Sequence, residues 1–331
     1  MTDNGAEQSK LTVQASDAGS RLDAFLAERI EGWSRSRLQR LIEAGDVLVN
    51  EKEAKPSYKL REGDEIDLDL SEEPAARFEP EDIPLDVVFE DEFLAVINKP
   101  AGMVVHPGAG VSGGTLANAI AFRFGTHNSP PYEEGVDAAL ADGVAVRPLQ
   151  ENRVGIVHRL DKDTSGLIVV AKDIGTQEKL SAAFRERTVK KTYIALVHGS
   201  PRENVGVIDR PIARDRWHRT KMTVAANGRQ SLTLWKVLKR FEKFTLLDVE
   251  IKTGRTHQIR VHLASINHPL VGDPTYNEGR DNTAALRRSI QNLGRVFLHA
   301  EKLEFTHPHT GEKLSFTQPL PNDLTNFLDL L

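Results

Sequence analysis

The sequence predicts an α+β protein in which a small domain of two helices and short strands precedes a larger domain with a largely antiparallel, mixed sheet flanked by helices and loops. Two amphipathic helical patterns lie near the N-terminus, and short alternating strand patterns follow them. A stretch rich in Pro, Ala and Glu interrupts the chain at 71–84, and many strand patterns with few helices follow it. With 331 residues, 39% of them hydrophobic, the chain can form two cores.

The small domain is expected over residues 20–71. The N-terminus before it (1–19) is polar without an apolar face and is expected to be disordered. Apolar residues at helical spacing indicate a first helix, and these are Leu22, Phe25, Leu26 and Ile30. A second helix, capped by Ser34 and ending near Gly45, would bury Leu38, Leu41 and Ile42. Short strands are predicted at 47–49 and 66–70.

A linker at 72–84 is expected to lead into the large domain, residues 85–331. That domain opens with two strands around an acidic turn at 87–100. Residues 125–153 lack a periodic pattern and contain Pro130-Pro131, which predicts an insertion or a long loop. The remaining patterns predict strands at 166–171, 190–198 and 244–252 and a helix at 177–187.

Composition excludes several kinds of chemistry and leaves nucleic-acid binding open. The chain has no cysteine, which excludes disulfides, thiolate nucleophiles and cysteine-bound zinc. Neither a signal peptide nor a run of about 20 apolar residues is present, so a soluble, cytoplasmic protein without a membrane partner is expected. The net charge of −5 argues mildly against general nucleic-acid binding but permits local basic surfaces.

A charged turn directly precedes the apolar strand predicted at 166–171. Its side chains are His158, Arg159, Asp161, Lys162 and Asp163. A rigid strand behind such a turn can aim these groups at one point, which favours a functional site. The alternative is an ordinary surface turn, because Asp, Thr, Ser and Gly are common turn formers.

A second cluster lies in TGRTHQIRVHLASI (253–266), where Thr256 can cap a helix that buries Ile259, Leu263 and Ile266. His257 and Arg260 would then share another face near the helix start. A basic helix start that binds an anion, either a phosphate or a catalytic carboxylate, is favoured over a solvated helix face. His257 and His262 are spaced unlike the i, i+4 pair of zinc hydrolases, so no metal site is predicted.

Two further basic segments are typical of RNA contacts. Arg214 and Arg216 belong to a basic stretch at 210–222 that surrounds Trp217, so phosphates could meet the charges while a base stacks on the indole. The second predicted helix carries Arg35, Arg37 and Arg40 without an intervening acid.

Two motifs suggest ligands but lack the required context. GAGVSG (108–113) matches a dinucleotide-binding pattern, yet Pro107 and a very short preceding strand contradict that context, so a flexible loop is preferred. HPHTGE (307–312) has no convincing third ligand and is interpreted as a hairpin turn. Accordingly, no cofactor, metal or dinucleotide is predicted.

Four motifs together resemble the RluA-type pseudouridine synthases, which isomerise uridine in structured RNA. They are HRLDKDTSGLIVVAK, TGRTHQIRVHL, RVFLHAEKLEFTHP (295–308) and KPAGMVVHPG (99–108), and the start of the chain resembles an S4-type RNA-binding domain. The S4-like start and the VVHPGAG loop are similar to the RluD-like branch, which modifies large-subunit ribosomal RNA. The 125–153 segment departs from compact members of the family. The resemblance implies a cofactor-free enzyme, monomeric by default, acting on ribosomal RNA or on an assembling large subunit.

The resemblance also implies roles for individual residues. Asp161 would be the catalytic carboxylate, acting either as a nucleophile at C1′ or as a base at C2′. Arg260 would pair with Asp161, and Tyr193 would lie against the flipped uracil and assist removal of the C5 proton. Arg159 would fill the gap that the flipped base leaves in the RNA. The implied substrate contacts are completed by Leu298, His106, Arg255 and His257, and the implied RNA contacts are Arg35, Arg37, Arg40, Arg214 and Arg216.

Other functions compete with this one. A paired-carboxylate glycosidase uses similar chemistry, but no second carboxylate is identifiable. A family member acting on transfer RNA, a non-catalytic ribosome-assembly factor and a nucleotide-dependent oxidoreductase are the remaining alternatives.

Overall fold

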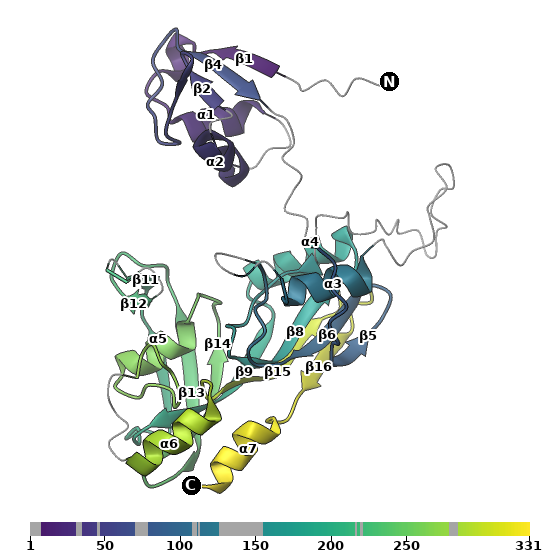
Figure 1. Ribbon diagram of the computed structural model, residues 1–331, viewed down its shortest axis with the longest axis vertical. Helices are drawn as coiled ribbons and strands as arrows, with labels where there is room; N and C mark the ends of the chain where they lie inside the picture. The colour runs from purple at the N-terminus through teal and green to yellow at the C-terminus, as the bar shows by residue number, and fades with distance from the viewer. Residues whose placement is uncertain are drawn as a thin grey trace. The chain divides into compact units, whose positions relative to one another are not determined.

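In the computed structural model the chain forms two compact units, residues 1–76 and 77–331. The residues that the structure describes are 8–30, 35–44, 47–69, 79–107, 111, 113–125, 155–215, 217–218, 221–277 and 284–331. Figure 1 shows the elements of each unit. The predicted 125–153 insertion lies outside the described residues, apart from Gly125.

The N-terminal unit packs two helices on a small antiparallel sheet whose strand order is β1-β4-β2-β3. The helices are α1 (Leu22–Arg29) and α2 (Arg35–Ala44), and the strands are β1 (Gln8–Thr12), β2 (Val47–Val49), β3 (Lys52–Glu53) and β4 (Glu65–Asp69). The predicted stripes of both helices meet in its core, where Leu22, Leu26 and Leu38 are fully buried. Because both helices bury the side chains chosen from their spacing, this part of the prediction is confirmed.

The predicted disorder of the N-terminus is wrong from residue 8 onward. Strand β1 pairs with β4 over Gln8↔Asp69 to Thr12↔Glu65, and Val13 after it is buried. Backbone pairing to a neighbouring strand holds this segment, and only Leu11 and Val13 contribute to the core. Two apolar residues are too few to produce a recognisable sequence pattern.

The C-terminal unit is built on a ten-stranded sheet with the order β10-β13-β14-β9-β15-β8-β6-β5, in which β7 also pairs with β8 and β16 with β15. Its pairings are antiparallel except for the parallel pair β15 and β8, as predicted for a largely antiparallel mixed sheet. The strands are β5 (Val87–Glu90), β6 (Leu94–Lys99), β7 (Gly155–Ile156), β8 (Ser165–Ala171), β9 (Lys190–His198), β10 (Val205–Asp209), β13 (Leu232–Arg240), β14 (Phe244–Ile251), β15 (Leu298–Thr306) and β16 (Lys313–Thr317). A separate hairpin consists of β11 (Ile212–Arg214) and β12 (Met222–Val224).

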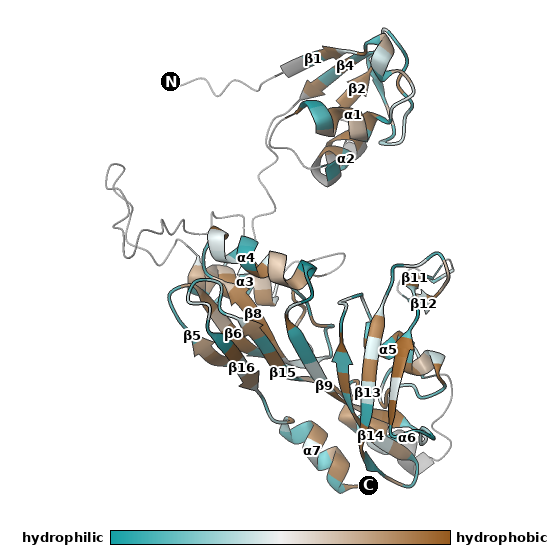
Figure 2. Ribbon diagram, turned by 180° about the vertical axis from the view of Figure 1, so that it is seen from behind, coloured by the Kyte–Doolittle hydropathy of each residue, from teal (hydrophilic) through white to brown (hydrophobic). Residues whose placement is uncertain are grey.

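Helices cover both faces of this sheet. The helices are α3 (Leu116–Phe124), α4 (Ile174–Arg185), α5 (Gln258–Ser265), α6 (Ala284–Leu293) and α7 (Asn322–Asp329). Ala95 and Ile97 of β6 pack in the same core as α3 and α5, whereas Leu94 and Val96 pack in the core of α4. Helices α6 and α7 pack in a further core with Ile194 and Leu196 of β9 and Phe244 of β14. Figure 2 shows hydrophobic residues along β6 and β8, which are buried between these layers.

The predicted linker is too long at its C-terminal end. The Asn118 amide of α3 donates to the Glu79 carbonyl oxygen over 2.8 Å, and Gly114 N–H donates to the Glu81 carboxylate over 3.0 Å. Residues 79 and 81 are therefore anchored to the C-terminal unit. Glu81 accepts the hydrogen bond of Gly114 N–H just before α3. A phosphate bound at this helix start would need that same backbone donor.

No helix among the described residues is long and apolar enough to cross a membrane.

Candidate active site

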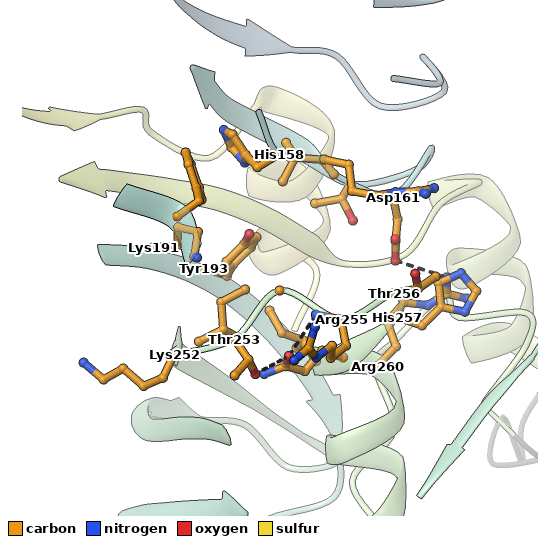
Figure 3. Close-up of a pocket in the computed structure, with 18 of the residues that line it drawn as sticks. His158, Asp161, Lys191, Tyr193, Lys252, Thr253, Arg255, Thr256, His257 and Arg260 are labelled. Carbon is orange, nitrogen blue, oxygen red and sulfur yellow. Dashed lines mark hydrogen bonds and ion pairs between the residues drawn. The ribbon is translucent and has the colours of Figure 1, made fainter. Parts of the chain in front are cut away.

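A pocket of about 580 Å³ opens in the C-terminal unit at the start of β8 (Figure 3). Its walls come from the turn before β8, the end of α4, the start of β9, the segment after β14, the first turn of α5 and the start of β15. Among the described residues that line it, Asp161 carries the single carboxylate. Seven cationic side chains line the same pocket, namely Arg159, Arg185, Arg187, Lys191, Lys252, Arg255 and Arg260.

The turn that carries Asp161 is held by backbone hydrogen bonds and by a neutral histidine. Thr164 N–H donates to the Asp161 carbonyl oxygen over 3.1 Å. His158 accepts a hydrogen bond from Val169 N–H over 3.0 Å and stacks on Phe184 with ring centroids 4.5 Å apart. Burial, followed by the charge of Lys191, lowers the pKa of His158 to about 3, so this ring is neutral. His158 thus orients the turn.

Glycine is required where this turn enters the sheet. Gly166 has φ +111°, and an added Cβ would lie 2.3 Å from the Ala300 carbonyl oxygen. The adjacent parallel pairing of His299 with Ser165 is therefore possible only with a bare backbone at residue 166.

Lys99 holds the other side of the turn, and the sequence patterns did not identify it as part of the site. This lysine is fully buried, and its Nζ donates to the carbonyl oxygens of Pro100 (2.7 Å), Met103 (2.8 Å) and Lys162 (3.1 Å). Burial is the main cause that lowers its pKa to about 7. The one local signal is a lysine that directly ends a buried apolar strand.

Arg260 lies beside Asp161, with Nη1 and Oδ2 3.4 Å apart. Its shorter bonds go to Asp273, to which Nε donates over 2.7 Å and Nη2 over 2.8 Å, and Nη2 also donates to Thr275 over 3.0 Å. Burial alone would lower the pKa of Arg260, but the hydrogen bonds and charge of Asp273, then the charge of Asp161, raise it overall. Asp273 therefore fixes the cation that faces Asp161. In sequence it is one acid in a GDP turn without a distinguishing pattern.

The start of α5 differs from the prediction in two ways. His257, rather than Thr256, is the residue before the helix, and it has a left-handed backbone at φ 55°. Arg260 is buried although it lies outside the predicted apolar stripe, which contradicts the alternative of a solvated helix face at this residue. The Gln258 side chain, the first of the helix, instead holds the segment before it by accepting from the Thr253 hydroxyl (2.7 Å) and from Arg255 N–H (3.1 Å).

The two histidines of this segment have separate partners. His257 Nδ1 is 2.9 Å from the Tyr276 hydroxyl, which accepts a hydrogen bond from Met222 N–H of the hairpin. His262 is buried between Thr233 and the carbonyl oxygen of Arg210. Within the described part of the chain, no cluster of three or more His, Cys, Asp or Glu side chains is suited to a metal ion.

Tyr193 and Leu298 form the apolar part of the pocket. Both are buried, on adjacent strands β9 and β15, and Ile251 and Ile259 line the pocket with them. Burial, with a smaller effect of Asp161, raises the pKa of Tyr193, which keeps its phenol protonated at neutral pH. A flat hydrophobic surface beside a single carboxylate suits a planar base.

The remaining pocket residues from the sequence lie near its opening. Arg159 and His106 lie at the protein surface. Partial burial of the His106 ring, followed by the charge of Arg159, lowers the pKa of His106. Arg255 is partly buried, and its Nε lies 3.5 Å from the Gln230 carbonyl oxygen. The structure thus brings all eight predicted catalytic and substrate-binding residues to one pocket, namely Asp161, Tyr193, Arg260, Arg159, Leu298, His106, Arg255 and His257.

The predicted RNA contacts outside the pocket are only partly described. Arg35 donates to the buried Asp23 over 3.0 Å, although half of its side chain is exposed, so this arginine also supports the N-terminal unit. Arg214 is exposed on β11, and Trp217 at the hairpin tip is 88% exposed. The side chains of Arg37 and Arg40, and all of Arg216, lie outside the described residues.

Family comparisons agree with this arrangement. The RNA pseudouridylate synthase family profile matches residues 93–265, and the S4 domain profile matches residues 20–66. The chain belongs to the RNA pseudouridylate synthase family. It is a pseudouridine synthase with an N-terminal S4 domain.

Two relatives match nearly the whole length of this pseudouridine synthase, and one solved structure matches 73% of it. Ribosomal large subunit pseudouridine synthase D of Nitrosomonas europaea is 43% identical over 97% of this chain and 87% of its own. An uncharacterized RNA pseudouridine synthase of Bacillus subtilis, YlyB, is 39% identical over 98% of each chain. The solved structure of human RNA pseudouridylate synthase domain containing 4 covers 73% of this chain and 91% of its own, with 25% identity and a TM-score of 0.55.

Proposed function

We propose that this synthase isomerises specific uridines in large-subunit ribosomal RNA, with Asp161 as the catalytic carboxylate. The observation that carries the proposal is Asp161, the single carboxylate among the described lining residues, which lies 3.4 Å from Arg260 in the pocket that Tyr193 and Leu298 also line. Relatives named as large-subunit ribosomal enzymes support the choice of RNA.

Asp161 suits both routes by which a carboxylate can detach uracil. As a nucleophile it would bond to C1′ while the C1′–N1 bond breaks, and as a base it would take the C2′ proton to give a glycal. In either route the freed uracil turns and C5 bonds to C1′. The Asp161–C1′ ester bond breaks as this bond forms in the nucleophile route, whereas in the glycal route Asp161 returns its proton to C2′. The C5 proton then leaves and N1 ends protonated. Arg260 would orient Asp161 through their ion pair.

The pocket supports this chemistry over that of a glycosidase. A retaining or inverting glycosidase needs a second carboxylate about 5–9.5 Å from the first. Asp163 is close in sequence but does not line the pocket, and Asp161 is the single acid among the described lining residues.

RNA would be held by cations beyond the reacting base. The pocket's cations suit a polyanion, and the exposed Trp217 beside Arg214 offers a stacking surface. Tyr276 bonds to both His257 of the pocket and Met222 of the hairpin, so RNA on the hairpin would sit in a fixed relation to the pocket. Arg35, Arg37 and Arg40 of the S4 domain would add phosphate contacts.

The test uses cells that lack this gene, rescued with the wild-type chain or with Asp161→Asn. Pseudouridines in ribosomal RNA are mapped by carbodiimide labelling and primer extension. We expect sites that return with wild type and stay absent with Asp161→Asn. Equal rescue by both would remove Asp161 as the catalyst. If neither rescue differs from the deletion, ribosomal RNA is the wrong substrate, and transfer RNA is then mapped to test the alternative.

A further inference from the structure

Lys191 is a buried cation at one end of the pocket, and the chemistry above does not use it. Lys191 is 8% exposed, although a lysine is rarely buried without a partner of opposite charge. Across the part of the chain that the structure describes, no carboxylate pairs with it, and its contact is the Phe184 ring, 5.2 Å from Nζ to centroid. Its pKa is lowered to about 8, mainly by burial and further by the charge of Lys252.

Strand geometry aims Lys191 into the pocket beside the reacting centre. Lys191 and Tyr193 are two residues apart on β9, so their side chains share one face, and both line the pocket. Lys190 faces the other way and forms an ion pair with Glu304. In Figure 3, Tyr193 lies between Lys191 on one side and Asp161 on the other. Lys191 and Tyr193 are about 7 Å apart along β9, since two residues of a strand rise by about that much.

The described residues that line the pocket with Lys191 are rich in cations, and the charge of Lys252 is the one that acts on Lys191. From α4 and the turn after it come Arg185 and Arg187, and from the segment after β14 come Lys252 and Arg255. His158, on the turn before β8, is neutral. Lys252 pairs with Glu250, and Asp161, the one carboxylate among the described lining residues, pairs with Arg260. Neither carboxylate forms an ion pair with Lys191 among the described residues. Desolvating a cation next to other cations is costly unless an anion enters with the ligand.

We propose that Lys191, one of the cations that line the pocket, forms a binding site for one backbone phosphodiester of the RNA strand, adjacent to the uridine held between Tyr193 and Leu298. This inference rests on the proposed function, because it assumes that an RNA strand enters the pocket. The phosphate would supply the missing counter-charge, and Lys191 would fix the sugar of the reacting nucleotide over Asp161. Lys191 is thus assigned to substrate binding and positioning.

The test measures binding of a large-subunit ribosomal RNA stem-loop to the full chain, with Asp161→Asn as the common background so that bound RNA is not converted. The stem-loop carries one uncharged methylphosphonate at a time, at each linkage around the uridine. We expect Lys191→Met to weaken binding of unmodified RNA about tenfold, as for one charge-assisted hydrogen bond. At one linkage the methylphosphonate should cost the background protein the same factor and cost Lys191→Met nothing further.

Lys190→Met is the matched control, since it removes an equal charge one residue away on the opposite face. We expect it to keep the full loss at every methylphosphonate. Lys191→Met should also unfold at the same temperature as its background or higher, because a costly buried charge is gone. A structural lysine would instead lower that temperature.

pH provides a second readout. Between pH 7 and 9 a lysine of pKa about 8 loses most of its charge, so RNA binding should weaken about tenfold relative to Lys191→Arg, which stays charged. The neighbouring arginines stay charged throughout, and His158 stays neutral.

The phosphate site is overturned if Lys191→Met binds unmodified RNA as tightly as its background does, or if every methylphosphonate costs both proteins the same factor. The proposed function fails separately, when the wild-type chain forms no pseudouridine in ribosomal RNA even though the coupling between Lys191 and one linkage is present.

Discussion

At the scale of single residues, the pocket sets the protonation states on which its chemistry depends. Asp273 holds Arg260 3.4 Å from Asp161, and the hydrogen bonds and charge of Asp273 raise the pKa of Arg260, so a fixed cation faces the carboxylate. Burial raises the pKa of Tyr193, and a protonated phenol is a poor base. We therefore expect Tyr193 to act mainly as a surface for uracil and as a hydrogen-bond donor, a narrower role than the assistance in C5 deprotonation that the family resemblance implies.

Tyr193→Phe separates these roles, because it keeps the ring and removes the hydroxyl. If the hydroxyl donates one hydrogen bond during turnover, the single-turnover rate should fall about tenfold while RNA affinity stays within about twofold. A rate loss above about 100-fold would instead indicate proton transfer by this residue. Equal losses in rate and affinity would mean that Tyr193 is structural.

At the scale of elements, the segment after α5 controls the catalytic turn from a distance. Asp273 does not line the pocket, yet it makes two short hydrogen bonds to Arg260. Lys99 at the end of β6 similarly bonds to the Lys162 carbonyl oxygen within the turn. We therefore expect the position of Asp161 to depend on Asp273 and Lys99, neither of which lines the pocket.

Asp273→Asn should therefore impair both stability and turnover. It leaves the buried Arg260 without its nearest counter-charge, which should lower the free energy of unfolding by about 3 kcal/mol. Turnover should fall more than RNA binding does, since Arg260 would no longer be fixed toward Asp161. Urea unfolding can be followed by tryptophan fluorescence, because Trp235 lies in the core of this unit.

Thr275→Val is the control for this change, because it removes one neutral hydrogen bond to the same guanidinium. It should lower the free energy of unfolding by about 1 kcal/mol and leave turnover nearly unchanged. If Asp273→Asn has effects no larger than Thr275→Val, Asp273 does not position the catalytic arginine.

At the scale of the whole molecule, the chain joins an RNA-binding unit to a catalytic unit, each with its own core. This division predicts that affinity and chemistry can be changed separately. The net charge of −5 conceals the arrangement, because seven cationic side chains and one carboxylate line the pocket among the described residues.

Replacing Arg35, Arg37 and Arg40 with alanine should weaken RNA binding and lower the slope of log affinity against log salt by about 2, for three lost phosphate contacts. The rate at saturating RNA should stay unchanged. Because Arg35 also pairs with Asp23, Arg37/Arg40→Ala serves as a control that keeps this pair. Unchanged affinity in both variants would contradict an RNA-binding role for this helix.

Local patterns in the sequence determined the order of most elements, the cores of α1 and α2, the antiparallel character of the sheet and, through family motifs, the residues of the pocket. They did not identify Asp273, Lys99 or Lys191 as part of the site. The physical reason is that local periodicity reports which face of an element is buried, whereas a partner depends on contacts across the chain, as with Arg260 and Asp161, 99 residues apart. Only tertiary structure decides which buried charge is paired and which one is left for a ligand.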